Sequence, residues 1–205
     1  SKLSMDDLFI TSVYSSRTKK WSASVSKEAP CSVDSDVPAI LVNNRLYWLL
    51  SSKARGLLEF DLDRQSLAVI ELPPHIEAGI SKLRIMPTED GGLGFIDLSG
   101  FHAEIWKRKP DSDGLAVWVL DRTIEFKGLP SNREGYYLCL VGFAEESNAI
   151  LVLTASGVFM VYLQPMEFKK LSDPKSFCHH YPFACFYPAG NSKPLYNLLL
   201  RGIII

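Results

Sequence analysis

The sequence predicts an all-β protein made of short antiparallel strands. Apolar runs of a few residues alternate with corners rich in Asn, Asp and Gly, which tolerate the backbone angles of tight reversals. None of these runs is long enough to favour a helix. A pattern of four strands also recurs at roughly fifty residues, a period typical of propeller blades. A hydrophobic content of 47% with 22% charged residues is that of a packed globular domain.

The clearest unit spans residues 38–74. Its four predicted strands are Ile40–Val42, Leu46–Leu50, Leu57–Leu62 and Leu67–Leu72. Asn43-Asn44-Arg45 make the first reversal, Asp63-Arg64-Gln65 make the third, and Pro73-Pro74 end the unit. A meander of four antiparallel strands that returns at a regular spacing predicts a propeller blade.

Two more units follow the same plan, at residues 82–126 and 136–172. The strands predicted for the first are Lys82–Met86, Leu93–Leu98, His102–Lys107 and Val117–Phe126. Those predicted for the second are Tyr136–Ala144, Ile150–Thr154, Val158–Leu163 and Met166–Leu171. The third strands are offset by 44 and 57 residues, and the fourth strands by 50 residues each time.

The two ends of the chain depart from this plan. Residues 6–25 align with the last two strands of a blade, so we expect a partial blade and a chain that is a piece of a longer protein. Ser26–Pro38 is predicted as a connection between blades. The tail, residues 173–205, is predicted as an irregular cover ending in an apolar strand or short helix at Leu195–Leu200. Residues 1–205 therefore form one region of about three and a half blades, which stabilise one another by stacking.

Charge and cysteine usage narrow the classes of partner. A net charge of −1 provides no long-range field for a nucleic acid or an anionic membrane, so neither is expected as a partner. Apolar clusters such as Leu195–Leu200 fall far below the roughly 20 residues of a membrane span. The four cysteines are irregularly spaced and are expected to be reduced thiols, at Cys31, Cys139, Cys178 and Cys185. We therefore expect a cytoplasmic or nuclear location.

Motifs that suggest chemistry are incomplete. The glycine-rich run Asp90–Gly94 is not followed by a helix that could bind a phosphate, so a hairpin turn is predicted. The cluster of Cys178, His179, His180 and Cys185 has side chains that zinc accepts, but it lacks the usual ligand spacing. No catalytic, cofactor-binding or metal-binding residues are therefore predicted.

Three further features have a structural and a functional interpretation. Asp111-Ser112-Asp113-Gly114, followed by Trp118, resembles an Asp-box turn, but a polar hairpin is favoured. The basic clusters, Arg17-Lys19-Lys20 and Lys107-Arg108-Lys109, are expected to be solvated. Core packing is favoured for the tryptophans Trp21, Trp48, Trp106 and Trp118, although a tryptophan on the rim would be a hot spot for a partner.

Similar short phrases occur at matching positions in the three units. They include Leu46-Tyr47-Trp48 with Leu58–Leu62, Gly92–Ile96 with Ala103–Trp106 and Val117–Leu120, and Val141–Glu145 with Gly157–Phe159 and Phe168–Leu171. These phrases resemble the repeat of plant F-box-associated propellers, particularly those of the large F-box families of grasses. The resemblance covers about Asp6 to Tyr187. It implies a kelch-like propeller that holds a protein for ubiquitination, while a separate F-box binds the Skp adaptor of a cullin ligase. This sequence contains no F-box segment, so we expect adaptor and cullin to be reached only through that missing part.

The predicted function is thus a protein-interaction module, the substrate-recognition domain of an F-box protein in an SCF-type ubiquitin ligase, with no catalysis and no cofactor of its own. One alternative is a propeller enzyme acting on glycans. It requires acids, Arg or Tyr converging from several blades, and no such residue recurs from blade to blade. The other is a truncated, non-functional F-box gene product, suggested by open blade faces and the apolar end Ile203–Ile205.

Overall fold

The fold is antiparallel β throughout the part of the chain that can be described. The computed structural model describes residues 7–29, 32–34, 37–51, 55–76, 82–129, 138–144 and 147–173. These contain no α-helix, and within them no helix is long and apolar enough to cross a membrane. The chain divides into two compact units, and each is described by itself. Unit 1 comprises residues 1–97 and 104–123, and unit 2 comprises residues 98–103 and 124–205.

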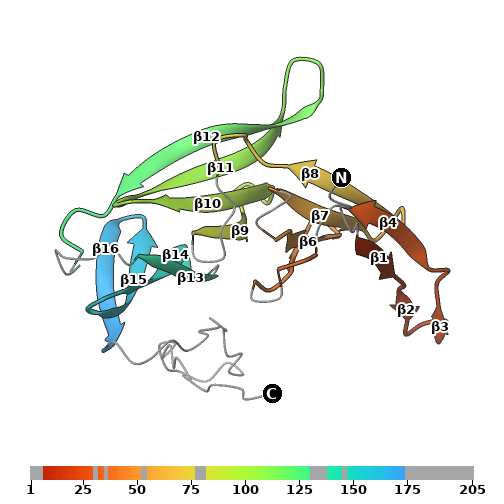
Figure 1. The fold of residues 1–205 in the computed structure, drawn as a ribbon, viewed down its shortest axis with the longest axis horizontal. Helices are drawn as coiled ribbons and strands as arrows, with labels where there is room; N and C mark the ends of the chain where they lie inside the picture. Colours follow the sequence, from red (N-terminus) through yellow and green to blue (C-terminus); the bar gives the residue numbers. More distant parts are fainter. Residues whose placement is uncertain are drawn as a thin grey trace, which may run out of the picture. The chain divides into compact units, whose positions relative to one another are not determined.

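The first complete sheet has the strand order β5-β6-β7-β8, and Figure 1 labels β6, β7 and β8. Its strands are β5 (Ile40–Val42), β6 (Arg45–Leu49), β7 (Gly56–Asp61) and β8 (Ser66–Glu71). Each lies within a residue or two of its predicted position. Asn43 and Asn44 have φ values of 48° and 60°, as a two-residue hairpin turn requires. The predicted reversal is confirmed, and Asn is suited to it because its short polar side chain tolerates the left-handed region.

The second sheet has the order β12-β11-β10-β9. Its strands are β9 (Leu83–Pro87), β10 (Leu93–Ser99), β11 (His102–Pro110) and β12 (Ala116–Glu125). Strand β11 runs three residues beyond its predicted end at Lys107, because it stays paired with β12 up to their hairpin. Gly94 is required in β10, since a Cβ atom there would lie 2.8 Å from the carbonyl oxygen of Trp106.

The third sheet, in unit 2, has the order β13-β14-β15-β16. Its strands are β13 (Cys139–Ala144), β14 (Ala149–Thr154), β15 (Gly157–Leu163) and β16 (Met166–Ser172). Gly157 begins β15 with φ 133°, and a Cβ atom there would lie 2.1 Å from the carbonyl oxygen of Ser172. The aligned third strands of the repeat are thus β7, β11 and β15, and the aligned fourth strands are β8, β12 and β16.

The N-terminal segment is one long hairpin with a break in each arm. Strand β1 (Asp7–Thr11) pairs with β4 (Val25–Ala29), and β2 (Tyr14–Ser15) pairs with β3 (Lys20–Trp21). At the break, the Ser22 amide donates to the Val13 carbonyl at 2.8 Å, and the Ser22 hydroxyl accepts from the Val13 amide at 2.9 Å. The expected end of the second arm at Val25 is wrong. The arm continues to Ala29, into the stretch predicted as a connection, because β4 pairs residue by residue with β1.

Both faces of the β5–β8 sheet are covered within unit 1. One face packs against the β9–β12 sheet in a core that includes Tyr47, Leu57, Ile70, Leu83, Phe95 and Trp106. On another side, Phe9 of the N-terminal hairpin packs against a cluster formed by Leu50 and Leu58. Neighbouring sheets thus bury each other's apolar side chains, which is the stacking expected of propeller blades.

Several predictions concern residues that the structure does not describe. They are those for residues 174–205, which include Leu195–Leu200, Cys178, His179, His180, Cys185 and Ile203–Ile205, and that for Cys31.

Candidate protein-binding surface

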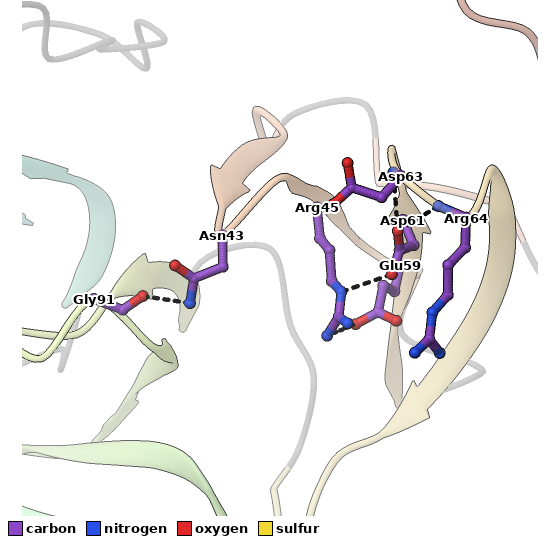
Figure 2. Close-up of polar contacts among 7 residues, drawn as sticks. All are labelled: Asn43, Arg45, Glu59, Asp61, Asp63, Arg64 and Gly91. Carbon is purple, nitrogen blue, oxygen red and sulfur yellow. Dashed lines mark hydrogen bonds and ion pairs between the residues drawn. The ribbon is translucent and has the colours of Figure 1, made fainter.

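Three turns of unit 1 are joined into one surface. In a meander, alternate turns lie at the same end of the sheet, so the β5–β6 and β7–β8 turns are neighbours. The Asn44 side-chain amide donates to the Asp63 carboxylate at 2.6 Å and links these two turns. The Asn43 side-chain amide donates to the Gly91 carbonyl at 2.8 Å and links them to the β9–β10 turn (Figure 2). We call these three turns, residues 43–44, 62–65 and 88–92, the turn surface.

Asp61, the last residue of β7, stabilises the turn surface. Its Oδ1 accepts hydrogen bonds from the backbone amides of Asp63 and Arg64, at 3.0 and 2.9 Å (Figure 2). Its Oδ2 accepts from Nε of Arg45 at 3.0 Å. The Arg64 amide, the Arg45 guanidinium and the Asp63 amide together outweigh burial and hold the pKa of Asp61 below its usual range. An ionised carboxylate therefore fixes the β7–β8 turn.

Arg45 connects this carboxylate to a buried tyrosine. Besides Asp61, its guanidinium lies 3.9 Å from the Glu59 carboxylate. The Tyr47 side chain is buried, and that burial, with a hydrogen bond to Glu59, raises the pKa of Tyr47 to about 12. The charged groups of this cluster are engaged with one another, so the cluster stabilises the turns.

The β9–β10 turn confirms the predicted hairpin at the glycine-rich run. The Thr88 amide donates to the Gly92 carbonyl at 2.9 Å, and the Gly91 amide donates to the Thr88 carbonyl at 2.8 Å. The Thr88 hydroxyl donates to the Asp90 carboxylate, which lowers the pKa of Asp90. Gly91 has φ 76°, where glycine is favoured. The run is thus a reversal between strands, not a phosphate-binding loop.

The exposed part of the turn surface is polar and carries both charges. Asn43, Asn44, Asp63 and Arg64 are exposed, and their backbone is held by the hydrogen bonds above. Ordered turns that display side chains at one end of a sheet suit recognition of another protein. Within the described residues, no group of three His, Cys, Asp or Glu side chains could hold a metal ion.

Comparison with known families identifies the fold more closely. The family described as "F-box protein AT5G49610-like, beta-propeller" matches residues 4–188. The chain belongs to this family. Comparisons with curated proteins and with solved structures found no match. Together with the stacked four-stranded sheets, the family match makes this chain the β-propeller of an F-box-like protein.

The tryptophans of this F-box-like propeller have different environments. Trp106 is 8% exposed and stacks on Phe95 at 5.9 Å between ring centroids, which confirms a core position. Trp118 is half-buried, and its Nε1 donates to the Glu71 carbonyl at 2.8 Å. Trp48 is half-buried against the Leu50 and Leu58 cluster. Trp21 is 69% exposed, so the core interpretation is wrong for it.

The two basic clusters also differ. Arg17, Lys19 and Lys20 are exposed, as predicted. Lys107 and Arg108 are half-buried, so the prediction is wrong for these two. Lys107 forms an ion pair with Asp121 at 3.0 Å, and the Arg108 guanidinium lies 5.8 Å from the ring centroid of Trp118. The reason is pairing within the sheet, because Lys107 and Arg108 both lie in β11 and contact side chains of the neighbouring strand β12.

The turn that begins at Asp111 is the polar hairpin that the sequence favours. Oδ1 of Asp111 accepts hydrogen bonds from the backbone amides of Asp113 and Leu115, both at 2.9 Å. Gly114 completes the reversal with φ 77°.

Sequence reasoning missed the turn surface as a unit. Its local signals are present, because Asn-Asn and Asp-x-Asp are both turn-forming sequences. The bond that joins the blades runs from Asn43 to Gly91, however, 48 residues apart. No local pattern predicts that contact.

Proposed function

We propose that this F-box-like propeller is the substrate-recognition domain of a plant SCF-type ubiquitin ligase. The family match over residues 4–188 carries the proposal. The Skp adaptor and the cullin would be reached through an F-box of the same receptor. The blades would be of the kelch-like kind, and the receptor would act in the cytoplasm or nucleus.

The propeller contributes binding alone, and other subunits transfer ubiquitin. The turn surface supports this role because Asp61 and the two asparagines hold its backbone before any partner arrives. A surface ordered in advance loses less conformational entropy on binding. Target side chains would dock against the exposed groups of the three turns, at Asn43, Asn44, Asp63 and Arg64.

The test uses the receptor that contains this chain, expressed in plant cells with and without an inhibitor of cullin neddylation. We expect the receptor to capture proteins that carry ubiquitin chains and that accumulate when the inhibitor is present. Substituting Asn44→Lys and Arg64→Glu should weaken their capture, whereas Lys169→Glu, an exposed change on β16 in unit 2, should not. If the captured proteins turn over at the same rate with the inhibitor, the ligase function is refuted.

A further inference from the structure

The tip of the N-terminal hairpin is an ordered structure. We use "hairpin tip" for Tyr14–Trp21. The Ser15 carbonyl accepts from the Lys19 amide at 2.7 Å, and the Ser15 hydroxyl accepts from the Thr18 amide at 3.3 Å. Lys19 completes the turn with φ 54°. The side chains of the tip are therefore presented on a defined backbone.

Two aromatic rings lie together on this tip. Tyr14 and Trp21 are directly opposite each other across β2 and β3, with ring centroids 5.3 Å apart. Tyr14 is 49% exposed and Trp21 is 69% exposed. Exposed Tyr and Trp side chains are enriched in the energetically dominant part of protein interfaces, because they offer large apolar area with few rotatable bonds.

The same tip concentrates positive charge. Residues 8–27 contain no Asp or Glu, although the whole chain has a net charge of −1. Arg17, Lys19 and Lys20 are exposed, and none of them forms an ion pair with another described residue. Three exposed cations thus lie on the same tip as the two exposed rings.

The base of the hairpin is anchored, and the described residues leave its tip exposed. Phe9 packs against the Leu50 and Leu58 cluster and fixes β1 to the β5–β8 sheet. Figure 1 shows β2 and β3 running away from β6–β8. The tip is therefore available to a partner, and binding there would not require the core of unit 1 to open.

We propose that the hairpin tip binds an acidic segment of a partner protein. Carboxylates of the segment pair with Arg17, Lys19 and Lys20, and an apolar side chain packs on Tyr14 and Trp21. This assigns a class of target segment to the proposed receptor, so it rests on the proposed function.

A protein segment fits the tip better than a nucleic acid. Nucleic acids are held through many phosphates along an extended basic surface, whereas the positive charge here is confined to one turn. A short acidic peptide needs only the few cations that the tip supplies.

The first test measures binding of a labelled peptide of Glu residues around one Leu, by fluorescence polarisation with the whole chain. We expect Arg17→Glu, Lys19→Glu and Lys20→Glu together to weaken binding by about tenfold or more, because attraction becomes repulsion. The matched control is Lys82→Glu, Lys109→Glu and Lys169→Glu, which changes the net charge equally at exposed sites outside the hairpin tip and the turn surface. Binding by that control should stay within about twofold of the original.

Two further variants separate the rings from the charges. Trp21→Ala should weaken binding of the acidic peptide by about tenfold, because an exposed aromatic contact is lost without a change in charge. The triple variant at Arg17, Lys19 and Lys20 should gain affinity for a matched Lys-rich peptide, an effect that a merely structural role of the tip would not produce. Equal losses in the tip and control triples would overturn the proposal, as would tighter binding of oligouridine RNA than of the acidic peptide.

The receptor assay separates this inference from the proposed function. If the tip triple variant still captures its ubiquitinated targets at the original level, the tip inference fails and the ligase function stands. If the original receptor captures no cullin-dependent target but the peptide results are as expected, the ligase function fails, and the tip is supported as a docking site of another kind of assembly.

Discussion

Replacing Trp106 by alanine tests whether the two sheets of unit 1 share the core described above. Trp106 is 8% exposed and its ring lies 5.9 Å from Phe95 and 5.2 Å from His75. Truncation of a buried tryptophan costs about 3–5 kcal/mol, and the aromatic contacts account for about 0.5–1.5 kcal/mol of such a loss. The substitution also removes the 3.1 Å hydrogen bond from Nε1 to Glu104. We therefore expect the free energy of unfolding to fall by about 3–5 kcal/mol.

The assay is equilibrium unfolding in urea followed by circular dichroism, and the matched control is Trp21→Ala. Because Trp21 is 69% exposed, its removal should change the free energy of unfolding by less than about 0.5 kcal/mol. A loss below about 1 kcal/mol for Trp106→Ala, with the same denaturant dependence, would contradict a shared core. An equally large loss for Trp21→Ala would contradict the exposed tip.

Three further predictions concern the turns and the cluster beneath them. Gly94→Ala should lower the free energy of unfolding in urea by about 1–3 kcal/mol, because the new Cβ would lie 2.7 Å from Cγ2 of Thr88. Gly91→Ala meets open space, so it should lower the free energy of unfolding by only about 1 kcal/mol, which is the cost of its positive φ. The pKa of Tyr47 is raised to about 12, so stability is complete below its unfolded pKa of about 10 and falls between pH 10 and 12; Tyr47→Phe should remove that fall. The pKa of Asp61 is lowered, so its contribution is present above the ordinary aspartate pKa of about 3.9 and lost as pH falls through the folded value; Asp61→Asn should flatten acid unfolding curves.

The blades could be predicted from sequence because each is a local structure. Asn43-Asn44 allows one kind of tight reversal, and the apolar runs on either side are too short for helices. The constant offset of 50 residues between fourth strands then placed β8, β12 and β16 correctly. Strand position here depends on residues that are close together in the sequence.

The strand ends and the contacts between turns could not be predicted, because they depend on distant pairing. Strand β4 continues to Ala29 through polar residues because β1 is opposite it, and nothing in the residues of β4 alone favours a strand. The same holds for Lys107 and Arg108, which read as a solvated basic run but are opposite β12. Pairing across a sheet decides their burial, and local composition does not.

Trp106 and Trp21 differ in burial although both lie in strands. Both lie in short strands, so sequence pattern alone favours the core for each. Trp106 lies in the third strand of a sheet packed against a neighbouring sheet, whereas Trp21 lies in a two-stranded segment beyond the anchored base of its hairpin. Trp21 is 69% exposed and its ring contacts Tyr14, on a tip that also carries Arg17, Lys19 and Lys20. The acidic-peptide experiment tests whether a partner covers it.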